Sequence, residues 1–206
     1  MDAATRAARE RVVGSIWTKL AYGFGSVAYG VKGNGFSYFL LLFYSQALGV
    51  DSASVGLAIF LTFLVDAFSD PVVGYLSDNL RTRFGRRHPF MYAAAIPVSV
   101  SFWFLWNPPE GYTNEQLFWY LLFWAILVRT LITLYEIPSS ALVAEFTTDY
   151  DERTTFLSYR SMFGWIGGVV VAVITLTLLL DRDSATGSGF TDVQGFREYG
   201  LLASLT

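Results

Sequence analysis

Two aspartates, Asp66 and Asp70, lie four residues apart inside one apolar stretch of the sequence. If this stretch is a helix, both carboxylates project from one face, about one turn apart. Two anions this close in a low-dielectric medium must be relieved by a bound cation, a proton or a basic partner. Carboxylate oxygens suit a hard ion such as sodium. We therefore predict a cation site at Asp66 and Asp70; the alternative is that they pair with Lys32 or Arg129 to hold helices together.

Three further charged side chains, Lys32, Arg129 and Glu136, also lie deep in apolar stretches. An unpaired charge at the centre of a bilayer is unfavourable by at least ~2.5 kcal/mol, so each needs a role. Helical spacing places Arg129, Thr133 and Glu136 on one face. Either this face turns toward the same cavity as Asp66 and Asp70, or Arg129 and Glu136 form a structural ion pair. Lys32 has three open roles: it lines a cavity, neutralises an aspartate, or lies in a distorted part of its segment.

The stretch 74–89 is rich in turn-forming and basic residues. Gly85 suits a turn with positive φ, and Pro89 suits the first turn of a helix. The stretch is therefore either a positively charged loop alone or a loop with an added gating role. The residues considered for gating are Gly74, Asp78, Arg81, Gly85, Arg86 and Arg87.

A later apolar stretch carries Arg160 together with Gly164 and Gly168. Arg160 either reaches the membrane interface with its long side chain or turns inward to a substrate. The two glycines have the spacing of a close helix contact. His88, the only histidine, has no second metal ligand nearby, so we expect no metal site beyond the sodium site.

The composition is that of a membrane protein: 15% of the 206 residues are charged, 53% are hydrophobic, and the apolar residues form long blocks. The net charge of -3 is too small to suggest a nucleic-acid partner. The sequence contains no cysteine, and we find no nucleophile with a neighbouring base, metal cluster or phosphate loop. We therefore expect neither an enzyme nor a cofactor other than the coupling ion.

A helix needs roughly 20 apolar residues to cross a bilayer. Five stretches meet this length, and a sixth begins near Tyr199 but reaches Thr206 in mid-span. We predict an all-α polytopic membrane protein with an incomplete sixth helix, and a tilted or kinked helix in the glycine-rich first span. The predicted helices lie near 17–48, 55–77, 89–107, 116–138, 156–180 and 199–206.

Lysines and arginines of the short loops predict which side of the membrane each loop faces. The tail 1–16, the loop 81–87 and Arg153 would lie on one side, whereas the opposite loops hold only Arg182 and Arg197. Because basic loops stay on the cytoplasmic side, we predict a cytoplasmic tail over 1–16. Residues 17–206 would form a transmembrane domain in the cell membrane, inner or plasma.

Four stretches carry a resemblance to a known family: KLAYGFG at 19–25, DAFSDPVVGYLSD at 66–78, RTRFGRRHPF at 81–90 and YEIPSSALVAE at 135–145. The loop pattern resembles the major facilitator superfamily. The full set is similar to its glycoside-pentoside-hexuronide:cation symporters, which include the melibiose permease. The resemblance implies the N-terminal six-helix half of that fold, working by alternating access against a second half.

By this resemblance, Asp66 and Asp70 match the family's cation-binding aspartates and Thr133 matches a threonine that helps to ligate the cation. Glu136 sits where the family has a sugar-binding aspartate, and Arg160 falls at a sugar-site arginine. These matches imply cation-coupled symport, with sodium or a proton, of a sugar, glycoside or related organic solute.

The sequence also departs from the family's pattern. Gly30 and Ser140 stand where the melibiose permease has a sugar-binding aspartate and a sugar-stacking tryptophan. Lys32 and Arg129 add positive charge, and we count both among the candidate substrate residues. Two alternatives therefore remain: symport of an anionic or lipid-like solute, and an inactive or partner-dependent half-transporter or membrane scaffold.

Overall fold

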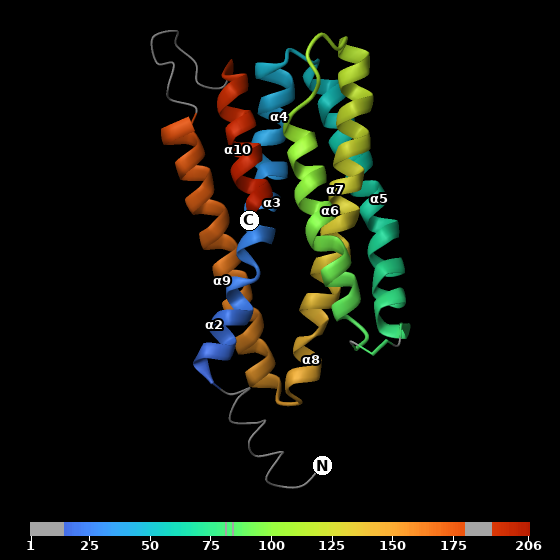
Figure 1. Ribbon diagram of the computed structural model, residues 1–206, viewed down its shortest axis with the longest axis vertical. Coiled ribbons are helices and arrows are strands. Elements are labelled where there is room, and N and C mark those ends of the chain that lie inside the picture. Colours follow the sequence, from blue (N-terminus) through green and yellow to red (C-terminus); the bar gives the residue numbers. More distant parts are fainter. Residues whose placement is uncertain (1–14, 81, 84, 180–190) are drawn as a thin grey trace, which may run out of the picture.

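The structure, a computed structural model, describes residues 15–80, 82–83, 85–179 and 191–206, which form a bundle of helices (Figure 1). No β-strand occurs in these ranges; a single isolated bridge joins Thr82 and Gly85. Four helical segments are long and apolar enough to cross a membrane: Ser52–Asn79, His88–Trp106, Asn114–Phe146 and Tyr150–Leu179. The chain is an all-α polytopic membrane protein, as the sequence predicted.

The first predicted span is divided into short helical pieces. The division begins at Gly25 and Ser26, where the Ser26 hydroxyl oxygen lies 2.6 Å from the carbonyl oxygen of Gly23 and 2.5 Å from that of Arg160. A side chain bonded in this way competes with the regular helical pattern and favours a bend. The pieces are α2 (Ile16–Phe24), α3 (Val27–Asn34), η1 (Gly35–Phe39), α4 (Leu40–Leu42) and η2 (Phe43–Ala47).

Most later helices begin at polar caps, ahead of the residues predicted for their starts. Asp51, Asp149 and Asp192 each accept a bond from the first turn of their helix, and Thr113 forms a capping box with Gln116. These capped first turns are polar, so a search for apolar stretches leaves them out. The helices are α5 (Ser52–Asn79), α6 (His88–Trp106), α7 (Asn114–Ala141), α8 (Val143–Phe146), α9 (Tyr150–Ile174), η3 (Thr175–Leu179) and α10 (Val193–Leu205).

Helix α7 also continues past Pro138, the predicted end of its span, to Ala141. Proline is tolerated inside membrane helices because neighbouring groups satisfy the freed backbone. The sixth segment begins at Val193 rather than near Tyr199, since Asp192 caps it. The tail 1–14 and the arginine at position 182 lie outside the described residues.

Helices α2 and α3 pack on α9, α5 and α6 pack on α7, and α10 packs on α6 (Figure 1). The contact between α3 and α9 depends on Gly30, Gly164 and Gly168. A Cβ atom built on Gly30 would overlap the carbonyl of Gly164, and one on Gly168 would lie 2.8 Å from the carbonyl oxygen of Gly30. The predicted close helix contact therefore forms here, and position 30 has no room for a side chain.

The start of α2, the junction between α5 and α6, and α8 lie at one end of the bundle (Figure 1). Arg86, Arg87 and Arg153 belong to these connections or to the adjoining first turn of α9. Arg197 pairs instead with Glu110, at 3.2 Å, in the connection between α6 and α7 at the opposite end. The cytoplasmic position of the basic end remains a prediction.

Candidate cation and solute site

Asp66 lies buried between α5 and α7, with 5% of its surface exposed. The Nε and Nη2 atoms of Arg129 both approach its Oδ2 atom, at 2.7 and 2.5 Å. The second oxygen, Oδ1, is buried and has no hydrogen-bond partner in the described part of the chain. Asp66 thus forms the ion pair that the sequence left as an alternative, yet one of its oxygens stays available as a ligand.

Asp70 lies one turn further along α5 and has a neutral partner. The Thr133 hydroxyl donates to its Oδ1 atom at 2.9 Å, while much of the residue stays exposed. The pairs Asp66 with Arg129 and Asp70 with Thr133 have the same sequence separation of 63 residues. Helices α5 and α7 therefore run parallel and in register, and this register places Arg129 beside Asp66 and Thr133 beside Asp70.

The candidate ligands at this interface are oxygens of Asp66, Asp70 and Thr133. Oxygen ligands suit sodium rather than a transition metal. Among the described residues, no group of three or more histidine, aspartate or glutamate side chains is arranged to hold a metal ion. His88 opens α6 and lies with its ring 6.2 Å from that of Tyr92.

Arg160 turns inward rather than toward the membrane interface, and its side chain is 12% exposed. Its Nη2 atom lies 3.5 Å from Oε1 of Glu136. Its Nη1 atom donates to the Ser139 hydroxyl at 2.6 Å, and Tyr22 donates to the Ser139 carbonyl at 2.7 Å. The Tyr29 hydroxyl also contacts Glu136. Arg160 of α9 is thus fixed to α7, next to the glutamate that the sequence singled out.

Arg129, Glu136 and Arg160 line one cavity of about 460 Å³. We call this the polar cavity; its walls come from α3, η1, α5, α7 and α9. Aromatic rings also line it, Phe63 and Trp165 among them. Sequence reasoning missed these rings because aromatic residues are frequent throughout the chain, at 17%. The cavity combines charged groups with apolar rings, as solute sites commonly do.

Lys32 is separate from this group. It is buried, with 4% exposed, and its amine lies 5.8 Å from the centre of the Phe102 ring. It lines a different, largely apolar cavity of about 530 Å³, whose wall includes Leu205 and Thr206. No carboxylate among residues 15–80, 82–83, 85–179 and 191–206 forms an ion pair with it. The structure therefore does not join Lys32 to Asp66 or to the polar cavity.

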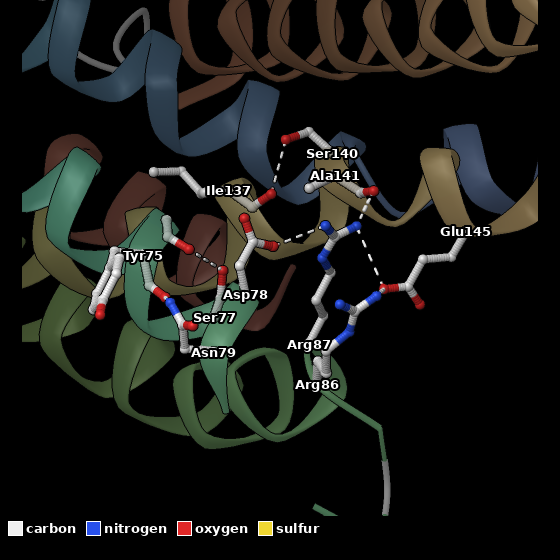
Figure 2. A network of polar contacts seen from close by, with 11 residues as sticks. Tyr75, Ser77, Asp78, Asn79, Arg86, Arg87, Ile137, Ser140, Ala141 and Glu145 are labelled. Atoms are coloured by element: carbon white, nitrogen blue, oxygen red, sulfur yellow. Dashed lines mark hydrogen bonds and ion pairs between the residues drawn. The ribbon is translucent and has the colours of Figure 1, made fainter. Parts of the chain in front are cut away.

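The two adjacent arginines of the basic loop have different surroundings (Figure 2). The side chain of Arg87 is 10% exposed; its Nη2 atom binds Oδ1 of Asp78 at 2.9 Å, and its Nη1 atom donates to the Ala141 carbonyl and lies 3.6 Å from Glu145. The side chain of Arg86 is 51% exposed and pairs with Glu145, at 3.2 Å. Arg87 thus ties the end of α5 to the junction of α7 and α8.

A tight turn precedes this pair. Gly85 has φ +94°, which favours glycine, and the Thr82 hydroxyl donates to its carbonyl at 2.7 Å. Gly74 faces α7, where a Cβ atom would meet Ile137 at an ordinary 3.9 Å, so it is not forced to be glycine by this contact. Arg81, the remaining gating candidate, lies outside the described residues.

Comparison with known proteins places these features in a family. The family described as MFS/sugar transport protein matches residues 21–204. A symporter from Synechocystis is 33% identical over 193 residues, covering 91% of this chain and 34% of the relative. The mouse sodium-dependent lysophosphatidylcholine symporter 1 is 33% identical over 165 residues, covering 78% of this chain and 31% of the relative.

The isoprimeverose transporter of Lactiplantibacillus pentosus is 29% identical over 143 residues, covering 69% of this chain and 30% of the relative. The chain spans about a third of the length of the curated relatives it matches. These relatives are transporters and not enzymes. The family match and the symporter relatives agree with the resemblance that the sequence motifs carry, and this chain belongs to the MFS/sugar transport protein family of the major facilitator superfamily.

Proposed function

We propose that the protein is a secondary active transporter that couples the movement of an organic solute to that of sodium or a proton. The observation that carries this proposal is the α5–α7 interface, where Asp66, with one unsatisfied oxygen, lies one turn from Asp70, whose carboxylate accepts from the Thr133 hydroxyl. Membership of a transporter family and relatives named as symporters support it.

The proposed coupling ion binds between Asp66, Asp70 and Thr133. A cation there offsets the repulsion between the two carboxylates and holds α5 against α7. Glu136 lies three residues beyond Thr133 on α7, so an ion that orders this helix also orders one wall of the polar cavity. Solute and cation then each raise the affinity for the other, as linkage requires.

The proposed solute site is the polar cavity. Glu136 accepts hydrogen bonds from solute hydroxyls, Arg160 donates them, and the aromatic rings provide an apolar surface. A sugar, a glycoside or a related organic solute fits this combination. Its site would be exposed alternately to the two sides of the membrane as this helical bundle rocks against a second six-helix half.

The Arg87 network is the proposed gate of the basic, cytoplasmic end. Asp78, Arg87 and the Ala141 carbonyl connect α5, α6 and α7 at one point (Figure 2). Breaking a partly buried ion pair of this kind is unfavourable, so it stabilises one orientation of the helices over another. We place this end, with the N-terminus, on the cytoplasmic side of the cell membrane because it collects the loop arginines.

Substitution of Thr133 tests the cation site without removing a charge. Thr133→Val keeps the shape of the side chain but removes the hydroxyl that contacts Asp70 at 2.9 Å. We expect the half-saturating concentration of the coupling ion to rise roughly tenfold in uptake assays, because losing one hydrogen bond to a charged group weakens binding by about 1.5 kcal/mol. Thr133→Ser retains the hydroxyl and should stay near the wild type. Equal ion dependence in Thr133→Val and wild type would remove Thr133 from the site.

A further inference from the structure

Asp66 and Arg129 form an asymmetric ion pair. Two nitrogens of the guanidinium approach one carboxylate oxygen, at 2.7 and 2.5 Å, whereas a fully matched pair places one N–H on each oxygen. The other oxygen of Asp66 is buried and has no hydrogen-bond partner among the described residues. Arg129 therefore satisfies only half of this carboxylate and leaves an anionic ligand for a further cation.

Arg129 also belongs to the wall of the polar cavity, whereas Asp66 does not. The Arg129 side chain is 23% exposed and that of Asp66 only 7%. The rings of Phe63 and Phe36 lie 5.1 and 5.8 Å from the guanidinium carbon. Aromatic faces attract a cation without binding it to one geometry. Arg129 is thus held beside the cavity in an environment that tolerates a shift of its charged group.

The charge of the cavity wall favours an anion. Its charged residues are Arg129, Arg160 and Glu136, so guanidinium groups outnumber carboxylates. Glu136 already pairs with Arg160 at 3.5 Å. The carboxylate that pairs with Arg129, that of Asp66, does not line the polar cavity. A carboxylate or phosphate entering the cavity would meet a guanidinium whose planar donor fork suits either group.

We propose, on the basis of the transport function above, that Arg129 is a tethered cation exchanged between Asp66 and an anionic group of the solute. Without solute, its guanidinium occupies Asp66. A carboxylate or phosphate of the solute draws Arg129 into the polar cavity. Asp66 then lacks a counter-charge and, with Asp70 and Thr133, takes up the coupling cation. The exchange makes cation binding depend on the solute anion, and it assigns the solute to the anionic class.

Small anions test this exchange on the purified protein. Sodium binding is followed by calorimetry, and proton binding by the pH of a weakly buffered solution. Acetate or inorganic phosphate, each as its choline salt, or acetamide is added at constant chloride. We expect acetate or phosphate to raise cation affinity about tenfold, a usual size for coupling between sites. Acetamide, which has the shape of acetate without its charge, should have no effect. The acetate and phosphate arms separate carboxylate from phosphate recognition.

Arg129→Gln removes the positive charge that is proposed to exchange between Asp66 and the solute. This variant should bind the cation about tenfold more tightly than wild type without any anion, and acetate or phosphate should no longer change its affinity. Arg197→Gln is the matched control, because Arg197 forms an ion pair with an exposed glutamate away from the site. The control should behave as wild type. If Arg129→Gln fails to fold, the anion response of the wild type still decides the question.

Three results would overturn the proposal. They are an unchanged cation affinity in Arg129→Gln, a wild-type response to acetamide equal to that of the anions, and no wild-type response to either anion. The wild type can still bind the cation, and lose this binding in Asp70→Asn, while one of these results is found. In that case the exchange is contradicted, but the proposed transport function stands. Absence of all cation binding in the wild type contradicts both.

Discussion

Uptake by an Asp70→Asn variant is expected to lose its response to sodium and to protons while the protein remains in the membrane. Among the described residues, the partner of Asp70 is the neutral Thr133 hydroxyl, whereas Asp66 already has Arg129. Replacing the carboxylate by an amide removes the charge that attracts the coupling ion. Because loss of a supporting residue alone typically weakens metal binding 10–100-fold, we expect loss of this ligand to weaken cation binding by at least about 100-fold.

Asp51→Asn is the matched control for this change. Asp51 caps the same helix, α5, by accepting a bond from the Ser54 backbone at 3.0 Å, and asparagine caps helices about as well as aspartate. This control should keep both uptake and ion dependence. Both variants are compared for surface expression and for ion-stimulated initial rates. Full sodium or proton stimulation in Asp70→Asn would exclude Asp70 from the cation site.

Arg160→Gln is expected to abolish solute uptake while leaving cation binding within about twofold of the wild type. Arg160 bridges Glu136 and the Ser139 hydroxyl, and it lines the polar cavity. Its removal leaves a partly buried carboxylate without its counter-charge and the cavity without a donor. Losing a hydrogen bond to a charged group is typically unfavourable by about 1.5–3 kcal/mol, so we expect the solute affinity to fall by up to roughly 100-fold.

Two further variants distinguish a solute role from a general structural one. Arg160→Lys keeps the charge but loses the planar fork, so it should recover uptake only in part. Arg197→Gln should transport normally, because Arg197 of α10 pairs with the exposed Glu110 away from the polar cavity. Solute uptake and cation binding are measured on each protein, together with its melting temperature. A parallel loss of cation binding and stability in Arg160→Gln would mean that the residue supports the fold rather than the solute.

Helical spacing alone predicted which site residues share a face. Asp66 and Asp70 are one turn apart on α5, and Arg129, Thr133 and Glu136 follow one side of α7. Their pairing across the two helices depends on the constant separation of 63 residues, which is a property of packing. Spacing within a helix is local, whereas the choice of neighbouring helix and its register depends on the whole core. The sequence therefore predicted the faces but did not decide between Lys32 and Arg129 as the partner of Asp66.

Burial separates residues that the sequence could not rank. Arg86 and Arg87 count equally as basic loop residues, yet their side chains are 51% and 10% exposed. The difference follows from their partners: Arg87 reaches Asp78 of α5 and the Ala141 carbonyl at the end of α7, whereas Arg86 pairs with Glu145 of α8. Lys32 had three open roles, and the structure places it in a largely apolar cavity whose walls include residues of α3, α6, α7 and α10. Such differences arise from tertiary contacts and leave no signal in residue type.

The most direct test of the transport account is uptake by purified protein in lipid vesicles. A panel of glycosides and organic anions is supplied with and without an inward sodium gradient, and across a range of pH. The account predicts that at least one solute accumulates above its external concentration, and only when a sodium or proton gradient is present. Uptake of that solute to the same rate and level without either gradient would contradict coupled symport.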